Sequence, residues 1–162
     1  MSNTITIGIA DLNIARAPDV LVTYALGSCV GICIYDANSH IGGLAHIMLP
    51  DSKLMPAGNV QIAKFADTAI VQLVKNLELA GARRSFLKAK IAGGAQMFAA
   101  LSNSDIANIG QRNVVAVKRV LNELHIPIIA EDVGANYGRT LYFYAQDGTM
   151  RIKSGNKGEW VF

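Results

Sequence analysis

The sequence predicts one layered α/β (α+β) domain, in which two main helices cover a mixed, largely antiparallel sheet. Three observations lead to this fold class. The first fifty residues alternate like β-strands, two segments with helical spacing follow, and short strand-like segments return towards the end. No linker rich in Pro, Ser or Gly interrupts residues 1–162, which we therefore expect to form a single domain.

The first part of the chain predicts four strands, over residues 5–9, 20–26, 29–36 and 41–49. Turn-forming residues at 37–40 join the last two strands, so we expect these strands to pair as a hairpin. Gly27-Ser28 predicts a second tight turn, which would pair the strand over 20–26 with the strand that follows it.

Helical spacing begins at Val60. One face carries polar side chains every three or four residues, at Gln61, Lys64, Thr68, Gln72 and Lys75. Asn59 is a suitable N-cap and Gly81 a suitable residue just beyond the C-terminus, so we expect a helix between them. A second helix is expected over about 112–125, where apolar residues share one face.

The second half of the chain supplies the remaining strands, which we expect over residues 86–92, 128–133, 140–145 and 150–153. Asp147-Gly148 predicts a hairpin turn between the last two of these strands. Gly93-Gly94 follows the first of them and is most simply interpreted as a bulge or a point of tight packing.

Composition excludes several classes of protein. With 51% apolar and 17% charged residues, the chain has too many apolar side chains for intrinsic disorder. No apolar stretch approaches the roughly 18 residues of a membrane-spanning helix, and the first residues lack the basic and apolar regions of a secretory signal. We therefore expect a cytoplasmic protein whose two cysteines are free thiols.

The net charge of +3 is unevenly distributed along the chain. Eleven of the fifteen basic residues lie in residues 82–162, which would suit an acidic partner surface. A solvated surface is the simpler interpretation. These basic residues form no run interleaved with aromatic side chains, so nucleic-acid binding is not predicted.

Cys29 is the most suggestive candidate for catalysis, because it follows Gly27-Ser28 at a strand boundary. Glycine at such a place allows a tight backbone and leaves the thiol uncrowded, as a nucleophile needs. Most free cysteines are buried and inert, so a place in the core is the alternative for Cys29. By the same reasoning, Cys33 is expected to be an apolar core residue.

The expected hairpin across residues 37–40 brings His46 close to Cys29. In that register Gly31 faces His46. Cys29 faces Met48, which makes Cys29 and His46 diagonal neighbours on one face, with Cα atoms roughly 7–8 Å apart. The glycine opposite the histidine is expected to leave space for a substrate. A thiol near an imidazole can attack a carbonyl, whereas a register shift of one residue would separate the two.

Other kinds of site have weaker support. A zinc site would draw on Cys29, Cys33 and His46, but these three residues lack tight CxxC spacing. No glycine-rich phosphate loop follows a strand, and no pair of carboxylates is spaced for acid–base catalysis. The sequence therefore predicts neither a metal nor a cofactor.

Residues 26–30 (LGSCV) and 42–50 (GGLAHIMLP) closely resemble the signature of CheD, a family of bacterial chemoreceptor glutamine deamidases. Further blocks carry the resemblance over nearly the whole chain, at residues 64–70, 90–98, 109–114 and 132–139. These blocks in this order are specific, although each alone would be weak. Ala135 departs from the pattern, in which a second glycine follows Gly134.

The resemblance implies a three-layer sandwich and a cysteine hydrolase that deamidates glutamine side chains of chemoreceptors through a thioester. It implies that Cys29 is the nucleophile, His46 the general base and Thr23 the residue that orients the histidine. The tight turn expected before Cys29 would instead place Thr23 opposite Ile32, on the face away from Cys29. Either a bulge near Gly27 changes this register or the two strands do not pair. The role of Thr23 therefore comes from the resemblance alone.

The resemblance also implies partners. CheD-like proteins act on the cytoplasmic helices of chemoreceptors and bind CheC-type phosphatases of the chemotaxis response regulator. A regulatory adaptor without turnover is therefore an alternative function, although Cys29, His46 and Thr23 together favour the enzyme. A thiol hydrolase for an unrelated amide or ester is a third alternative.

Overall fold

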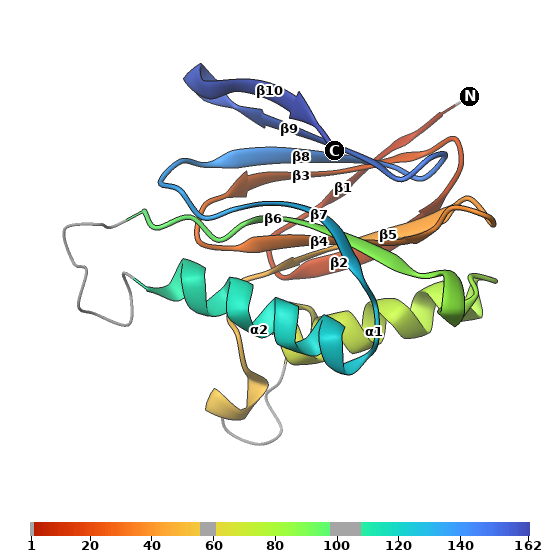
Figure 1. Ribbon diagram of the computed structural model, residues 1–162, viewed down its shortest axis with the longest axis horizontal. Helices are drawn as coiled ribbons and strands as arrows, with labels where there is room; N and C mark the ends of the chain where they lie inside the picture. Colours follow the sequence, from red (N-terminus) through yellow and green to blue (C-terminus); the bar gives the residue numbers. More distant parts are fainter. Residues whose placement is uncertain (1, 56–60, 98–107) are drawn as a thin grey trace.

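The structure, a computed structural model, describes residues 2–55, 61–97 and 108–162, which form two five-stranded sheets and two α-helices (Figure 1). Sheet A contains, in spatial order, β1 (Thr4–Ile7), β3 (Val20–Leu26), β8 (Arg139–Tyr144), β9 (Thr149–Ser154) and β10 (Gly158–Val161). Sheet B contains β2 (Asp11–Arg16), β5 (Ile41–Ile47), β4 (Val30–Asp36), β6 (Lys88–Gly93) and β7 (Ile128–Val133). The helices are α1 (Ala66–Leu79) and α2 (Ile109–Glu123).

These elements form three layers. Both helices lie against one face of sheet B, and sheet A lies on its other side (Figure 1). One apolar core, which includes Ile32 and Leu73, fills the space between the helices and sheet B. A second core, which includes Leu44 and Phe143, lies between the two sheets. The predicted α+β class, with two main helices in a sandwich, is confirmed, but the strands divide into two mixed sheets where the sequence predicted one.

The hairpin of β4 and β5 has the predicted register. Gly31 pairs with His46, and Val30 pairs with Ile47. β4 also pairs with β6 on its other side. Every residue of β4 and β5 is buried, because these strands lie inside sheet B and both faces of the sheet are covered. A histidine in β5 therefore enters the interior of the protein.

β3 and β4 do not form the predicted hairpin. β3 pairs with β1 and β8 in sheet A, whereas β4 belongs to sheet B. Residues 27–29 carry the chain from one sheet to the other, after a register shift beyond Thr23 and a left-handed backbone at Ala25 (φ 60°). The prediction that Thr23 opposes Ile32 on a shared sheet is therefore wrong.

The two helices lie close to their predicted positions. α1 ends as expected, with Gly81 just beyond its C-terminus at a φ of 112°. It begins later than predicted, at Ala66, because residues 62–64 form a separate 3₁₀ turn, and the predicted cap Asn59 lies outside the described residues. α2 begins slightly before the predicted start, at Ile109. None of the helices in the described ranges is long and apolar enough to cross a membrane.

The strands β2 and β10 are absent from the sequence prediction. Both lie at the edge of a sheet, and about every second residue of β2 faces solvent. Edge strands bury little apolar surface, so their sequences carry a weak strand signal.

Candidate functional site

Cys29 lies in the crossover between the sheets, directly before β4. Its side chain is partly exposed, whereas Cys33 is fully buried within β4, as predicted. Burial raises the pKa of the Cys29 thiol above its ordinary value, and the backbone N–H of Cys29 opposes this effect. Burial also raises the pKa of the Cys33 thiol. Of these two thiols, only Cys29 is open to a substrate.

His46 is buried between the two sheets, with no exposed surface. Its ring is within hydrogen-bonding distance of sheet A, where the Thr23 hydroxyl lies 2.7 Å from Nδ1. The same hydroxyl donates a hydrogen bond of 2.7 Å to the Ile7 carbonyl. Since a hydroxyl has a single proton to donate, Thr23 accepts a hydrogen bond from Nδ1–H of His46. The lone pair of the imidazole is therefore on Nε2.

Nε2 of His46 has no hydrogen-bond partner among the described residues. Burial lowers the pKa of His46 to about 4, so the ring is neutral at physiological pH. A buried ring nitrogen with an unused lone pair, held in one tautomer by a neighbouring strand, is suited to accept a proton. The structure thus brings Thr23 and His46, from different sheets, within hydrogen-bonding distance.

Cys29 packs against the same inter-sheet core into which the His46 ring points. The confirmed β4–β5 register places Cys29 one residue beyond the paired segment, diagonal to His46. The thiol makes no hydrogen bond to Nε2 in this structure. Cys29 and His46 are therefore neighbours, as a nucleophile and its base would be, but they are not hydrogen-bonded. Catalytic hydrogen bonds are often long before the substrate binds.

Gly31 does not leave space for a substrate, and that expectation is wrong. A Cβ atom at Gly31 would lie 3.0 Å from the Leu141 side chain and 3.1 Å from that of Leu26. Both leucines belong to sheet A, so the position opposite His46 is closed by packing between the sheets.

The carbonyl groups of Gly27, Ser28 and Cys29 each accept a hydrogen bond. Ala95 N–H donates to the Gly27 carbonyl and Gly94 N–H to the Cys29 carbonyl, each over 2.8 Å. Gly93 permits this approach, because a Cβ atom there would lie only 2.3 Å from the Cys29 carbonyl oxygen. The prediction of tight packing at Gly93-Gly94 is confirmed.

Asn113 supplies the hydrogen bond to the Ser28 carbonyl, and the sequence analysis assigned it no role. Its side chain lies on α2 with no exposed surface, and its Nδ2 donates to the Ser28 carbonyl over 3.0 Å and to the Met48 carbonyl over 2.9 Å. One side chain thus joins the segment before Cys29 to the segment after His46. A polar residue in line with the buried Val117 and Leu121 was the available signal.

A cavity of about 270 Å³ lies next to Gly94, between α2 and the loop after β7. Its other lining residues are Gln96, Asn108, Gln111, Val114, Val133, Gly134 and Ala135. Gly94 also donates its N–H to the Cys29 carbonyl, so the cavity adjoins the crossover that bears the thiol.

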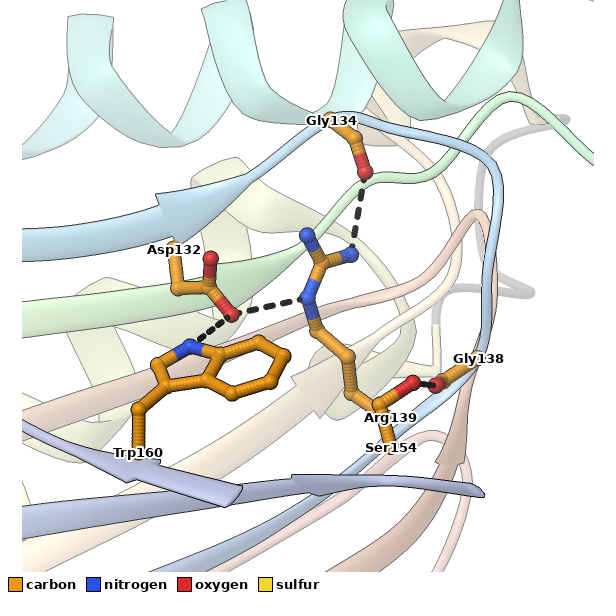
Figure 2. Close-up of polar contacts among 6 residues, drawn as sticks. All are labelled: Asp132, Gly134, Gly138, Arg139, Ser154 and Trp160. Carbon is orange, nitrogen blue, oxygen red and sulfur yellow. Dashed lines mark hydrogen bonds and ion pairs between the residues drawn. The ribbon is translucent and has the colours of Figure 1, made fainter. Parts of the chain in front are cut away.

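The loop after β7 is fixed by a buried charge network, which Figure 2 shows from Asp132 to Trp160. Arg139 donates from Nε to Asp132 and from a terminal nitrogen to the Gly134 carbonyl, each over 3.0 Å. Trp160 donates its indole N–H to the same Asp132 oxygen over 3.0 Å. Ala135 takes a left-handed conformation (φ 60°), so the loop keeps a backbone that glycine would adopt more easily. This loop in turn bonds residues 93–96 at Gly93 and Gln96.

No group of three or more His, Cys, Asp or Glu side chains suited to a metal ion occurs within the described ranges. Cys29, Cys33 and His46, the residues from which a zinc site would draw, therefore do not form such a group.

Comparison with known proteins gives matches over nearly the whole chain. A family model described as CheD chemotactic sensory transduction matches residues 48–154. A probable chemoreceptor glutamine deamidase CheD of Lachnoclostridium phytofermentans is 52% identical over 157 residues, which are 97% of each chain. A chemoreceptor glutamine deamidase CheD of Halalkalibacterium halodurans is 50% identical over 159 residues, which are 98% of each chain. A probable chemoreceptor glutamine deamidase CheD of Clostridium novyi is 53% identical over 155 residues.

Proposed function

Since this chain belongs to the CheD family, we propose that it is an amidohydrolase that converts glutamine side chains of chemoreceptors to glutamate. In this proposal residues 1–162 act as one deamidase domain in the cytoplasm. The hydrogen bond between Thr23 and His46 carries the proposal, because it leaves Nε2 free as a proton acceptor near the crossover that bears Cys29.

The first half of the reaction forms a thioester. Nε2 of His46 accepts the proton of the Cys29 thiol while the sulfur attacks the carboxamide carbon of a receptor glutamine. The C–N bond of the tetrahedral intermediate then breaks, and the proton on Nε2 passes to the departing nitrogen, which leaves as ammonia. Thr23 keeps Nδ1–H in place throughout, so the ring presents the same nitrogen in both steps.

The second half of the reaction uses the same residues. A water molecule loses a proton to Nε2 of His46 and attacks the thioester carbon. The C–S bond breaks, and the proton returns to the sulfur of Cys29. The product is a glutamate side chain, and the enzyme is regenerated without a metal or cofactor entering any step.

Burial keeps both the Cys29 thiol and the His46 imidazole uncharged before the substrate is attacked. Burial raises the pKa of the Cys29 thiol and lowers that of His46 to about 4, so a thiolate–imidazolium pair is disfavoured before attack. Proton transfer to His46 therefore accompanies the formation of the S–C bond, as in general-base catalysis.

The finer details of partner and substrate come from the family resemblance. The cytoplasmic helices of chemoreceptors are the proposed substrate, and a CheC-type phosphatase is a proposed partner. The excess of basic residues in the second half of the chain suits a charged receptor surface.

Mass spectrometry on a receptor cytoplasmic fragment tests the proposal. Each deamidation replaces NH₂ by OH and adds about one dalton. We expect conversion by the unaltered protein and none by Cys29→Ala or His46→Ala. Cys33→Ala is the matched control, because it removes the buried thiol and should leave turnover intact.

Undiminished conversion by Cys29→Ala would overturn the nucleophile assignment. Activity on small amides but not on receptor fragments would indicate a different thiol hydrolase. Capture of a CheC-type phosphatase by a protein that never converts glutamine would favour the adaptor alternative.

A further inference from the structure

We infer that the backbone N–H groups of Ser28 and Cys29 form the oxyanion site, and that Asn113 is a positioning residue that turns the N–H of Cys29 towards the oxygen of the reacting carbonyl. This inference rests on the proposed function, since an oxyanion arises only if Cys29 attacks an amide. Asn113 does not touch the substrate and acts through the peptide group that it holds.

The carbonyl groups of the crossover fix the direction of its N–H groups. A trans peptide group is planar, and its C=O and N–H point in opposite directions. Asn113 holds the Ser28 carbonyl over 3.0 Å, so the N–H of Cys29 points away from α2. Ala95 holds the Gly27 carbonyl over 2.8 Å, so the N–H of Ser28 points away from residues 94–95.

These two N–H groups are available to a ligand. Neither Ser28 N–H nor Cys29 N–H has a backbone or side-chain acceptor within the described ranges. The N–H of Cys29 belongs to the residue that carries the thiol, so this donor lies next to the sulfur. Unpaired backbone donors next to a nucleophile are the usual components of an oxyanion site.

The hydrogen bonds of Asn113 indicate that its side chain serves as a donor to two backbone carbonyl groups. Its Nδ2 serves two carbonyl groups, at Ser28 and Met48, while its buried Oδ1 has no hydrogen-bond partner among the described residues. A buried unpaired acceptor costs free energy, about 1–3 kcal/mol in general. An apolar residue would avoid that cost but would release both carbonyls, so the fold keeps the amide for its NH₂ group.

The hydrogen bond from Asn113 to the Met48 carbonyl connects the proposed oxyanion site to the strand that bears His46. Met48 follows His46 by two residues, and its carbonyl shares Nδ2 of Asn113 with Ser28. One side chain therefore sets the distance between the segment with the N–H donors and the end of the strand with the imidazole. Neither segment can shift without breaking a hydrogen bond to Asn113.

Two reactions of the Cys29 thiol distinguish a misplaced oxyanion site from a general disturbance of the structure around Cys29. Deamidation passes through an oxyanion, whereas alkylation of Cys29 by iodoacetamide is displacement at a saturated carbon and builds none. We expect Asn113→Ala to lower kcat for a receptor fragment about 10- to 100-fold, below the 10²–10³-fold effect of removing an oxyanion donor outright. KM and the rate of Cys29 alkylation should change less than about twofold.

Asn122→Ala is the matched control, because Asn122 is an exposed asparagine on the same helix. It should leave kcat, KM and alkylation unchanged. Asn113→Ser, which keeps one donor, should lie between the unaltered protein and Asn113→Ala. If kcat and alkylation fall by the same factor in either Asn113 variant, or if only KM changes, the inference is wrong.

A measurement on the unaltered protein covers the case in which the variants do not fold. Cys29 would add to the carbonyl carbon of a receptor peptide with an aldehyde in place of the glutamine carboxamide. The S–C bond forms, the C=O π bond breaks, and the thiol proton passes by way of Nε2 of His46 to the new oxygen. The resulting hemithioacetal holds this oxygen where the oxyanion would lie. The amide protons of Ser28 and Cys29 should then shift downfield in the NMR spectrum. Addition without these two shifts would overturn the inference, whereas turnover by Cys29→Ala would overturn the proposed function itself.

Discussion

Thr23 and His46 belong to different sheets, and a hydrogen bond of 2.7 Å between Oγ1 and Nδ1 joins them across the interior. The hydroxyl is also committed to the Ile7 carbonyl in the neighbouring strand, which fixes the direction of its proton. The tautomer of the histidine is therefore decided by the pairing of β1 with β3, far from His46 in the sequence.

Thr23→Val tests this control of the tautomer. Valine keeps the shape of threonine but removes the acceptor for Nδ1–H and the donor to Ile7. We expect kcat to fall on the order of 100-fold, less than the 10⁴-fold effect of an altered aspartate in a serine-protease triad. The free energy of unfolding should fall by about 1–3 kcal/mol, because two buried polar groups lose their partner.

Thr23→Ser is the control for this change, since it keeps the hydroxyl. Deamidation by the serine variant should stay within a few-fold of the unaltered protein. The measurements are steady-state deamidation and urea unfolding, and equal kcat values for the valine and unaltered proteins would contradict the assigned role.

His46 should make the protein less stable in mild acid. Its pKa is about 4 in the folded protein and 6.5 for an unperturbed histidine, so the unfolded chain binds the proton more readily between these values. As the pH falls from 6.5 to 4, this group should lower the free energy of unfolding by up to roughly 1.4 kcal/mol per pH unit.

His46→Gln provides the reference for this pH dependence. Carboxyl groups titrate in the same range, so the informative quantity is the difference in unfolding free energy between the two proteins at each pH. That difference should vary between pH 4 and 6.5 and become constant above 6.5. A difference independent of pH would show that His46 titrates normally.

Two glycines with positive φ should respond differently to alanine. At Gly93 (φ 110°) a Cβ atom would lie 2.3 Å from the Cys29 carbonyl oxygen, whereas at Gly134 (φ 82°) nothing lies within 4 Å. Gly134→Ala should cost about 1–2 kcal/mol from the backbone conformation alone. Gly93→Ala should cost about 2–5 kcal/mol, because the clash is added, and should also reduce deamidation. Urea unfolding provides the comparison, and equal costs would contradict the packing described at Cys29.

The contribution of the charge network in Figure 2 to stability can be tested at Arg139, with Arg151, which lies outside the network, as the matched control. Arg139 stacks on Tyr137 and Arg151 on Tyr142, with guanidinium-to-ring distances of 4.5 and 4.4 Å. The Arg139 side chain is 1% exposed and that of Arg151 31% exposed. Arg139→Met should cost about 3–5 kcal/mol, because it leaves a partly buried carboxylate without its cation. Arg151→Met should cost less than about 1 kcal/mol. Similar unfolding midpoints for the two variants would contradict this difference.

Local chemistry was sufficient to predict the β4–β5 hairpin. The turn residues at 37–40 lie between two alternating segments, so the register that pairs Gly31 with His46 followed from a short stretch of sequence. The placement of Thr23 could not be derived in this way, because β3 pairs with β1 and β8, and β8 begins only at Arg139. A switch between sheets after Ala25 resembles a tight turn when only neighbouring residues are considered.

The role of Asn113 illustrates a second limit. The resemblance includes its segment, and helical spacing places it in line with buried residues, but neither observation identifies its partners. Those partners are backbone carbonyls at Ser28 and Met48, which have no sequence signal. The contact follows from the packing of α2 against sheet B, which spacing along one helix does not specify.

The distribution of Cys29, His46 and Thr23 over a crossover and two sheets has a consequence for biogenesis. A chain that has formed its hairpins but has not yet joined its two β layers holds the thiol and imidazole without the hydroxyl that selects the tautomer. By the proposed mechanism such an immature molecule lacks activity, because no acceptor for Nδ1–H holds the imidazole in the tautomer that serves as base.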